Sequence, residues 1–264
     1  MITKNELKYY NSLLQKKFRK LENKFICEGK KVVLECLESS YQSEIIFITQ
    51  KFLEKEEEYI NNLKSFETRI VKLKSIDFRK VSDTRAPEGV AGVFFFENKK
   101  PDLSDISDPI IIYLEDISDP GNLGTIMRNC DWFGIKNIFL SPDSAEIYNP
   151  KVIRASTGSI FHINIFEEML LDNILILKKS GYKFVCADIK GESVYNFKVP
   201  QQSILFLANE SSGPSENLLS KSDEVISIPG RGKAESLNVS SASAILLSEL
   251  TKQQISSCLT PTPN

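Results

Sequence analysis

The sequence predicts an α/β protein of two domains, the second of which contains a mostly parallel sheet. Short apolar strands alternate with amphipathic, helix-length segments through both halves of the chain. A polar stretch bounded by prolines, from Asn98 to Pro109, separates the two halves. The second half opens with Ile110–Leu114, an apolar run typical of strands that are covered on both faces. The chain has 264 residues, and we expect its domains at residues 1–98 and 108–264.

The first domain is expected to begin with an amphipathic helix over residues 5–22. The apolar side of this helix would carry Leu7, Leu13, Leu14, Phe18 and Leu21. Strand and helix patterns then alternate. The expected elements are a strand at 25–27, a helix at 30–38, a strand at 45–48, a helix at 53–63, a strand at 70–73, a short helix at 75–81 and a strand at 89–97. These elements form a compact α/β domain of ordinary size.

The second domain repeats the alternation, which favours a parallel sheet with helices on both faces. After the strand at 110–114 we expect a helix that ends at Gly134. The later elements are a strand at 137–140, a helical turn at 151–155, a strand at 161–166, a helix at 169–179 and strands at 183–187, 203–207 and 225–228. A turn at Pro229–Gly232 then leads into an apolar-periodic final helix, for which Ser236 is the expected N-cap.

Composition excludes several classes of protein. Hydrophobic residues make up 41% and charged residues 26%, as in globular proteins with a real core. No apolar stretch is long enough for a transmembrane helix, and Met1–Glu6 lacks the apolar region of a signal peptide. The five cysteines are scattered, and His162, the only histidine, is expected within a strand. We therefore expect a cytoplasmic protein with neither a membrane partner nor a metal site.

Charge is distributed unevenly along the chain. Residues 1–31 contain nine Lys or Arg against three Glu, whereas the whole chain has a net charge of −2. A basic segment on a mildly acidic protein is typical of a contact surface for a polyanion such as RNA. The alternative is a helix face that is merely solvated.

An α/β domain raises the question of a dinucleotide site. Asp119–Gly124 follows the first strand of the second domain and opens a helix, but it lacks the G-x-G-x-x-G pattern. A ligand is still expected beyond the carboxyl ends of the strands. The connectivity brings three polar loops to that edge, at residues 116–128, 208–216 and 228–240.

These loops carry motifs of a known family. They contain the blocks Asn122-x-Gly124-x-x-x-Arg128, Ala208-Asn209-Glu210-x-x-Gly213, and Ile228-Pro229 with Ser236-Leu237-Asn238-Val239-Ser240. In this order and spacing, they resemble the three motifs of the SpoU (TrmH-like) RNA 2′-O-ribose methyltransferases of the SPOUT class. Arg154-Ala155-Ser156-x-Gly158 resembles a segment that the family carries between its first and second motifs. The resemblance covers nearly the whole chain.

The resemblance implies a fold and a cofactor. The second domain would be a SPOUT domain with a deep trefoil knot, and the first would be an RNA substrate-binding domain akin to kink-turn-binding ribosomal proteins. S-adenosyl-L-methionine would bind in the knot. By family position its contacts would be Ala208, Asn209, Gly213, Ile228, Gly230 and Leu237. Apolar walls and small residues that allow close backbone approach suit an adenine ring.

The resemblance also implies methyl transfer to a ribose 2′-OH. The catalytic positions would be Asn122, Arg128, Glu210, Ser236 and Asn238. A guanidinium has no acceptor for a proton, so we expect Arg128 to clamp an RNA phosphate and to stabilise the developing oxyanion. Each position also has a structural interpretation: Asn122 and Glu210 are turn candidates, and Asn238 and Ser236 are capping candidates.

The motifs depart from the family pattern at two places. Ala208 stands where the family has Gly, and Gly230-Arg231 stand where Met follows the proline. These departures leave two hypotheses. The first is an RNA 2′-O-methyltransferase, a homodimer acting on ribosomal RNA in preference to transfer RNA. The second is a catalytically silent homologue that binds structured RNA through its basic first domain.

Overall fold

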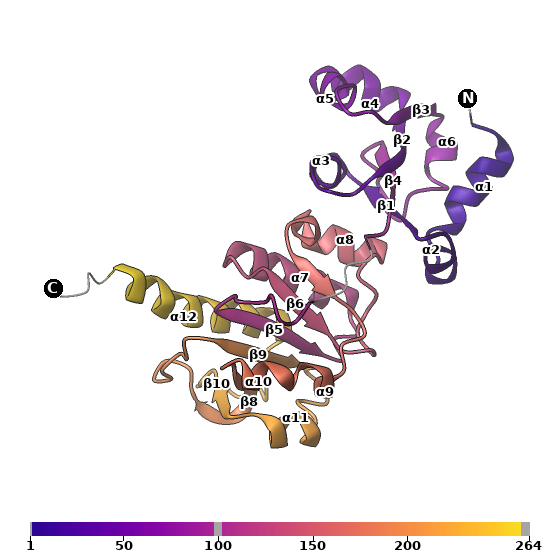
Figure 1. Cartoon of the computed structure of the whole chain (residues 1–264). Coiled ribbons are helices and arrows are strands. Elements are labelled where there is room, and N and C mark those ends of the chain that lie inside the picture. Colours follow the sequence, from indigo (N-terminus) through magenta and orange to yellow (C-terminus); the bar gives the residue numbers. More distant parts are fainter. Residues whose placement is uncertain (1, 98–101, 260–264) are drawn as a thin grey trace. The chain divides into compact units, whose positions relative to one another are not determined.

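The computed structural model describes residues 2–97 and 102–259, with side chains up to Lys252, and its contacts divide the chain into two units (Figure 1). The first unit comprises Met1–Asn98 and Glu146–His162, and the second comprises Lys99–Ala145 and Ile163–Asn264. The segment Glu146–His162 lies in sequence within the expected second domain, yet its contacts lie in the first unit. The boundaries at 1–98 and 108–264 themselves stay a prediction.

The described part of the first unit contains a four-stranded sheet. The strand order is β1 (Lys24–Glu28), β4 (Val90–Phe95), β2 (Ser43–Thr49), β3 (Arg69–Leu73). β1 and β2 run antiparallel to β4, and β3 runs parallel to β2. The helices are α1 (Lys4–Ser12), α2 (Lys16–Glu22), α3 (Lys30–Glu38), α4 (Gln50–Lys55), α5 (Glu57–Leu63), α6 (Ser75–Phe78) and α8 (Pro150–Ser156), with a 3-10 turn at Ser159–Phe161. The domain is therefore α/β, as expected.

Two expected helices of this unit are broken. Residues 5–22 form α1 and α2, because Gln15 is extended between them. Leu13, at the break, is completely buried, whereas Leu21, expected on the apolar side, is 67% exposed. Residues 53–63 are divided between α4 and α5 at Glu56, whose backbone leaves the helical region (φ −120°, ψ 53°). Hydrophobic periodicity alone does not reveal such breaks, because packing of one residue fixes them.

Aromatic packing explains why the segment Glu146–His162 belongs to the first unit. The ring of Tyr148 stacks on Phe25 at 4.5 Å and on Phe96 at 4.2 Å between centroids. Arg19 of α2 forms a buried ion pair with Glu146 at 2.6 Å. His162, expected in a strand, follows the 3-10 turn instead, and its Nε2 lies 2.8 Å from a carboxylate oxygen of Glu35. The segment is therefore anchored by specific side-chain contacts.

The described part of the second unit contains a six-stranded sheet in which every strand pair is parallel. The strand order is β10 (Glu224–Ser227), β8 (Lys183–Ser193), β9 (Ser203–Ala208), β5 (Ile110–Glu115), β6 (Asn137–Leu140), β7 (Asn164–Phe166). The helices are α7 (Pro120–Trp132), α9 (Leu171–Ile174), α10 (Ile176–Lys179), α11 (Glu216–Lys221) and α12 (Val239–Leu259). Figure 1 shows α7 and α12 on one face of the sheet and α9, α10 and α11 on the other. The predicted parallel sheet is confirmed.

Several details of the second unit differ from expectation. The expected strand at 161–166 shortens to β7, and the expected helix at 169–179 divides into α9 and α10 at Leu175. α11, capped by the Ser215 side chain, was not expected at all. The final helix begins at Val239, so Ser236 is not its N-cap. Among the described residues, no helix is long and apolar enough to cross a membrane, and no group of three side chains is suited to hold a metal ion.

Candidate active site at the carboxyl edge of the parallel sheet

Hydrogen bonds join the three polar loops of the second unit at the carboxyl ends of the strands. The amide Nδ2 of Asn238 donates to Asn122 Oδ1 at 3.0 Å and to Glu210 Oε2 at 2.8 Å. Asn238 and Glu210 lie in the loops after β10 and β9, and Asn122 lies in the first turn of α7, which follows β5. The expectation that the loops gather at one edge of the sheet is confirmed, because one side chain bridges all three.

Asn238 has two structural roles beside this bridge. Its Oδ1 accepts the backbone N–H of Ser240 at 3.0 Å, which satisfies a free donor at the start of α12. Its backbone C=O accepts from Ala242 at 2.9 Å, the first helical bond. Asn238 is therefore the N-cap that was assigned to Ser236. The reason is spacing: a cap side chain reaches the N–H two or three residues later, and Ser236 lies too far upstream of Val239.

Glu210 holds the start of α12 against the loop after β9. One carboxylate oxygen accepts from both Asn238 Nδ2 and the Val239 N–H, at 2.8 and 3.3 Å. A carboxylate near the first turn of a helix also interacts favourably with the helix dipole. Glu210 is thus not only a turn residue; it connects two of the three motifs.

The start of α7 explains the position of Asn122. Asp119 caps the helix by accepting the Asn122 N–H at 2.8 Å, and Pro120 occupies the first turn, where its missing N–H costs nothing. The backbone of Asn122 therefore belongs to the turn, while its side chain reaches Asn238. Asn122 is thus a turn residue through its backbone and a site residue through its side chain.

Arg128 lies further along α7 and is exposed. Across the part of the chain that the structure describes, its guanidinium makes no hydrogen bond and no ion pair. It is not joined to the Asn122–Asn238–Glu210 network. Since a guanidinium carries five N–H donors, this one is free to bind an anion such as a phosphate.

The expected cofactor residues fall into two groups. Ala208 ends β9, Asn209 donates to the Asp116 C=O at 3.0 Å, and Gly213 adopts the left-handed conformation at φ +66°. This group forms an ordered loop. Ile228 is half-buried just after β10, but Gly230 and Leu237 lie in an exposed loop, with Leu237 47% exposed.

The residues present fit an adenosine-containing cofactor. Among the described residues, 229–237 make no hydrogen bond to the rest of the chain, so their backbone groups remain available to a ligand. Leu237 offers an apolar surface, and the ordered loop after β9 offers backbone groups beside Ala208. Adenine requires this combination of apolar contact and backbone hydrogen bonds.

Cysteine chemistry is excluded at this site. Burial raises the pKa of the Cys130 thiol on α7 well above its ordinary value. Burial likewise raises the pKa of Cys186 on β8 to about 12. A nucleophilic cysteine requires the thiolate, and neither thiol ionises near neutral pH.

Sequence reasoning missed residues that support the site from behind. Glu115, at the end of β5, accepts the Ser215 N–H at 2.9 Å and the Ser215 hydroxyl at 2.7 Å, and so fixes the start of α11. Asn129 donates to the Ser240 C=O at 2.9 Å and to Ser243 Oγ at 2.8 Å, and so joins α7 to α12. The sequence signal that could have identified Glu115 is a carboxylate at the end of an otherwise apolar strand.

Both halves of the chain match known protein families. Residues 109–248 match the model of the SpoU rRNA Methylase family, and residues 4–92 match the MRM3-like substrate binding domain. The 23S rRNA (guanosine(2553)-2′-O)-methyltransferase RlmP of Bacillus subtilis is 32% identical over 247 residues, which cover 93% of this chain and 95% of that protein. The first of these family matches contains the three motif blocks.

Solved structures agree with this placement. A TrmH-family protein from Porphyromonas gingivalis superimposes with a TM-score of 0.82 at 29% identity, covering 96% of this chain and 99% of the other. The SpoU methyltransferase AviRb from Streptomyces viridochromogenes, solved in complex with AdoMet, shares the fold with a TM-score of 0.87 at 23% identity, with 96% and 99% coverage. The family match spans more than half of the chain and includes all three motif loops. This chain belongs to the SpoU rRNA Methylase family.

Proposed function

We propose that this protein transfers a methyl group from S-adenosyl-L-methionine to a ribose 2′-OH of ribosomal RNA. The observation that carries the proposal is the hydrogen-bonded network of Asn122, Asn238 and Glu210. It lies at the ligand-binding edge of a parallel sheet, in a chain whose full-length relative is a 23S rRNA 2′-O-methyltransferase. The intact network favours catalysis over a silent RNA-binding homologue.

The cofactor would be held by the loops after β9 and β10. Ala208, Asn209 and Gly213 supply the ordered wall, and Ile228, Gly230 and Leu237 supply the wall that closes over it. We propose that the chain from Ile228 onward is threaded through a loop as a deep trefoil knot, which would make these walls part of one pocket. When bound, S-adenosyl-L-methionine supplies the electrophilic methyl group.

The side chains of the site suit activation of a weak nucleophile. A ribose hydroxyl attacks only when its proton is removed or its developing charge is stabilised. Arg128 has no side-chain partner among the described residues, so it binds the RNA phosphate beside the target ribose and stabilises the oxyanion, while that phosphate assists deprotonation. Asn122 and Asn238 orient the ribose, Glu210 positions Asn238, and Ser236 donates a hydrogen bond from the exposed loop.

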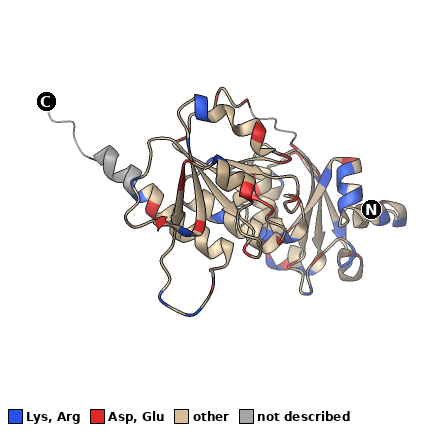
Figure 2. Cartoon of the chain, turned by 90° about the horizontal axis from the view of Figure 1, so that it is seen from below, with Lys and Arg blue, Asp and Glu red and all other residues tan. Residues whose placement is uncertain are grey.

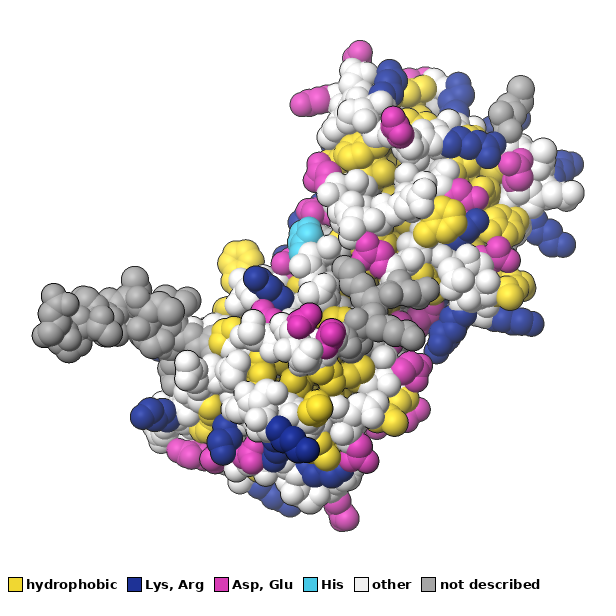
Figure 3. Space-filling model, viewed as in Figure 1, with side chains coloured by type: hydrophobic (Ala, Val, Ile, Leu, Met, Phe, Trp, Pro, Cys, Tyr) yellow, Lys and Arg dark blue, Asp and Glu magenta, His cyan; other side chains and the backbone are white. Residues whose placement is uncertain are grey.

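The first unit would bind the substrate RNA. The basic residues of 1–31 lie largely on α1 and α2, and Figures 2 and 3 show Lys and Arg gathered along these helices. A positive surface of this kind attracts the RNA phosphate backbone irrespective of sequence. We also propose that the reaction takes place in the cytoplasm.

A second copy of the chain would complete the enzyme. Trp132 ends α7 and is 84% exposed, which is unusual for tryptophan. Arg128 and Trp132 are four residues apart on the same helix, so they share one face. A second copy that covers Trp132 would therefore lie against Arg128, and the site would be built at the interface of a homodimer.

The test is direct. The protein is incubated with methyl-labelled S-adenosyl-L-methionine and, in separate reactions, unmodified ribosomal RNA and transfer RNA. The label should appear in ribosomal RNA as an alkali-resistant 2′-O-methyl nucleotide. Label in transfer RNA alone would overturn the substrate class. No label in either pool, with RNA still bound, would favour the silent homologue.

A further inference from the structure

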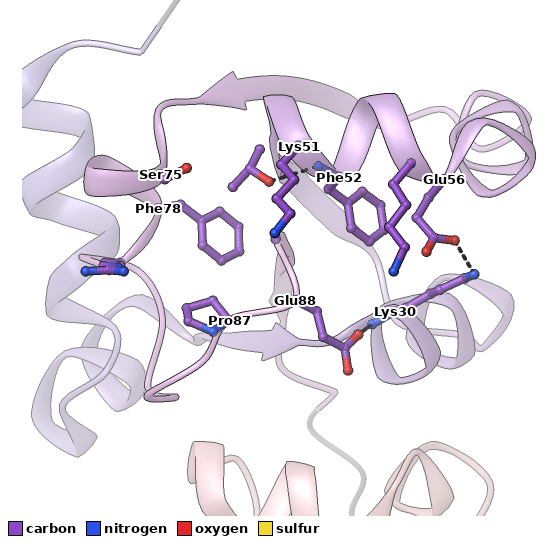
Figure 4. Close-up of a pocket in the computed structure, with 12 residues that line it drawn as sticks. Lys30, Lys51, Phe52, Glu56, Ser75, Phe78, Pro87 and Glu88 are labelled. Atoms are coloured by element: carbon purple, nitrogen blue, oxygen red, sulfur yellow. Dashed lines mark hydrogen bonds and ion pairs between the residues drawn. The ribbon is translucent and has the colours of Figure 1, made fainter.

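The first unit contains a cavity of about 400 Å³ that the proposed methyl-transfer site does not use. It lies between α4, α6 and the loop that leads into β4 (Figure 4). Its volume is within the range of about 300–1,000 Å³ that is usual for sites of small ligands. The cavity is thus large enough for one nucleotide.

Free positive charge surrounds this cavity. Lys51, Lys55 and Arg79 line it, and within the described chain none of their side chains has an ion pair or a hydrogen bond. Lys51 and Lys55 are one helical turn apart on α4 and therefore share a face. Figure 4 shows Lys51 pointing into the space between Phe52 and Phe78.

The two carboxylates of the cavity are already engaged by Lys30. Glu56 forms an ion pair with the Lys30 ammonium at 2.5 Å, and Glu88 accepts the Lys30 N–H at 2.8 Å. The ammonium of Lys30 also lowers the pKa of Glu56, so this carboxylate stays ionised and paired at neutral pH. Lys51 and Arg79 therefore keep their charge for an external anion, and Lys55, which also lowers the pKa of Glu56, adds to the positive rim.

Apolar side chains form the floor and one side of the cavity. Phe52 and Phe78 are buried beneath it, and Pro87 forms one side. Gly89 fixes the loop closely against α4, since a Cβ at this position would lie 2.4 Å from Thr49 Oγ1. A site with apolar walls and a cationic rim suits a nucleotide, whose base is flat and whose phosphate is charged.

We propose that this cavity binds one unstacked nucleotide of the substrate RNA, with its phosphate held by Lys51, Lys55 and Arg79. The proposal rests on the proposed RNA methyltransferase function and adds a recognition site that acts on RNA binding alone. A nucleotide splayed out of a loop or bulge would enter it, since unpaired bases are the ones that proteins can read individually. The cavity would fix the position of the RNA, and the methyl transfer would occur elsewhere on the chain.

The test compares two variants with the same loss of charge. Lys51→Ala/Arg79→Ala removes two rim cations, and Lys179→Ala/Lys198→Ala removes two exposed cations of the second unit. Binding of unmethylated 23S ribosomal RNA is measured by filter binding over a series of salt concentrations. The cavity variant should bind at least about tenfold more weakly. Its log affinity should also fall less steeply with log salt, by about 2 in the magnitude of the slope, because two phosphate contacts are lost. The control variant in the second unit should change affinity by less than about threefold.

Two further measurements separate this inference from the proposed function. Affinity for S-adenosyl-L-methionine should not change in the cavity variant, and KM for RNA should rise while kcat at saturating RNA is kept. Ultraviolet crosslinking of the wild-type complex should attach a nucleotide to a peptide containing Lys51 or Arg79. Equal losses in both variants, with crosslinks elsewhere, would overturn the cavity site while leaving the enzyme intact. Failure of the wild-type protein to bind 23S ribosomal RNA would overturn both.

Discussion

Among single residues, Arg128 stands out because its guanidinium has no partner within the described chain and it lies on the helix that carries Asn122. Arg128→Ala should reduce single-turnover methyl transfer by about 10²–10³-fold, the cost of removing one donor to a developing oxyanion. Arg128→Lys should recover only part of this loss, because an ammonium keeps the charge but not the planar fork. Affinity for S-adenosyl-L-methionine is the control and should not change. Full activity in Arg128→Ala would remove this residue from the mechanism.

Asn238 combines a helix cap with the bridge between motifs, and substitutions can separate the two roles. Asn238→Ala loses both and should lower the unfolding free energy by about 1 kcal/mol, as for other caps. Asn238→Asp keeps the acceptor that binds the Ser240 N–H but places a second carboxylate against Glu210. Methyl transfer should therefore fall in both variants.

The double variant Asn238→Asp/Glu210→Gln provides the matching rescue. It restores one donor and one acceptor across the same contact, with the direction of the hydrogen bond reversed. Thermal unfolding should return toward the wild-type midpoint relative to Asn238→Asp alone. If the double variant is no more stable than Asn238→Asp, the contact with Glu210 does not carry the interaction that the geometry indicates.

Between elements, the clearest dependence is that of α2 on the start of the segment Glu146–His162. The side chains of Arg19 and Glu146 are only 2% and 5% exposed, and two hydrogen bonds, at 3.0 and 2.6 Å, join them. Glu146→Gln leaves Arg19 buried beside a neutral partner and should cost about 3–5 kcal/mol of unfolding free energy.

Replacing both partners tests whether the ion pair stabilises the fold more than an apolar pair at the same positions would. Arg19→Met/Glu146→Leu should recover most of the loss, because an apolar pair avoids the desolvation of two charges. Arg19 also donates to the Leu13 C=O at 3.0 Å, so about 1 kcal/mol should remain lost when that acceptor has no partner. Calorimetric unfolding of the four proteins measures the coupling. Additive losses in the double variant would show that the two side chains do not interact.

For the whole molecule, the prediction concerns assembly. Trp132→Asp should convert a dimer into a monomer in analytical ultracentrifugation, because it places a charge where an apolar surface is covered. Methyl transfer should fall with it, since Arg128 occupies the same face of α7. Ile189→Asp is the matched control, because Ile189 is a comparably exposed apolar residue on β8. A dimeric Trp132→Asp protein would contradict the proposed interface.

The sequence by itself determined the class of the fold and the meeting place of the motifs. Strands that alternate with helices dictate a parallel sheet, and a parallel sheet brings its connecting loops to one edge. The loops that carry Asn122, Glu210 and Asn238 were therefore predicted to meet, although more than a hundred residues separate the first of these residues from the last. Local chemistry and connectivity suffice for such features.

Only the tertiary structure decided where the expected helices break, which residue caps α12, and to which unit the segment Glu146–His162 belongs. The helix at residues 5–22 breaks where Leu13 packs, and α12 starts where Asn238 reaches Ser240. The segment Glu146–His162 joins the first unit because Tyr148 stacks on both Phe25 and Phe96. Each of these depends on contacts between residues far apart in the chain, and patterns of hydrophobicity within one segment carry no information about such partners.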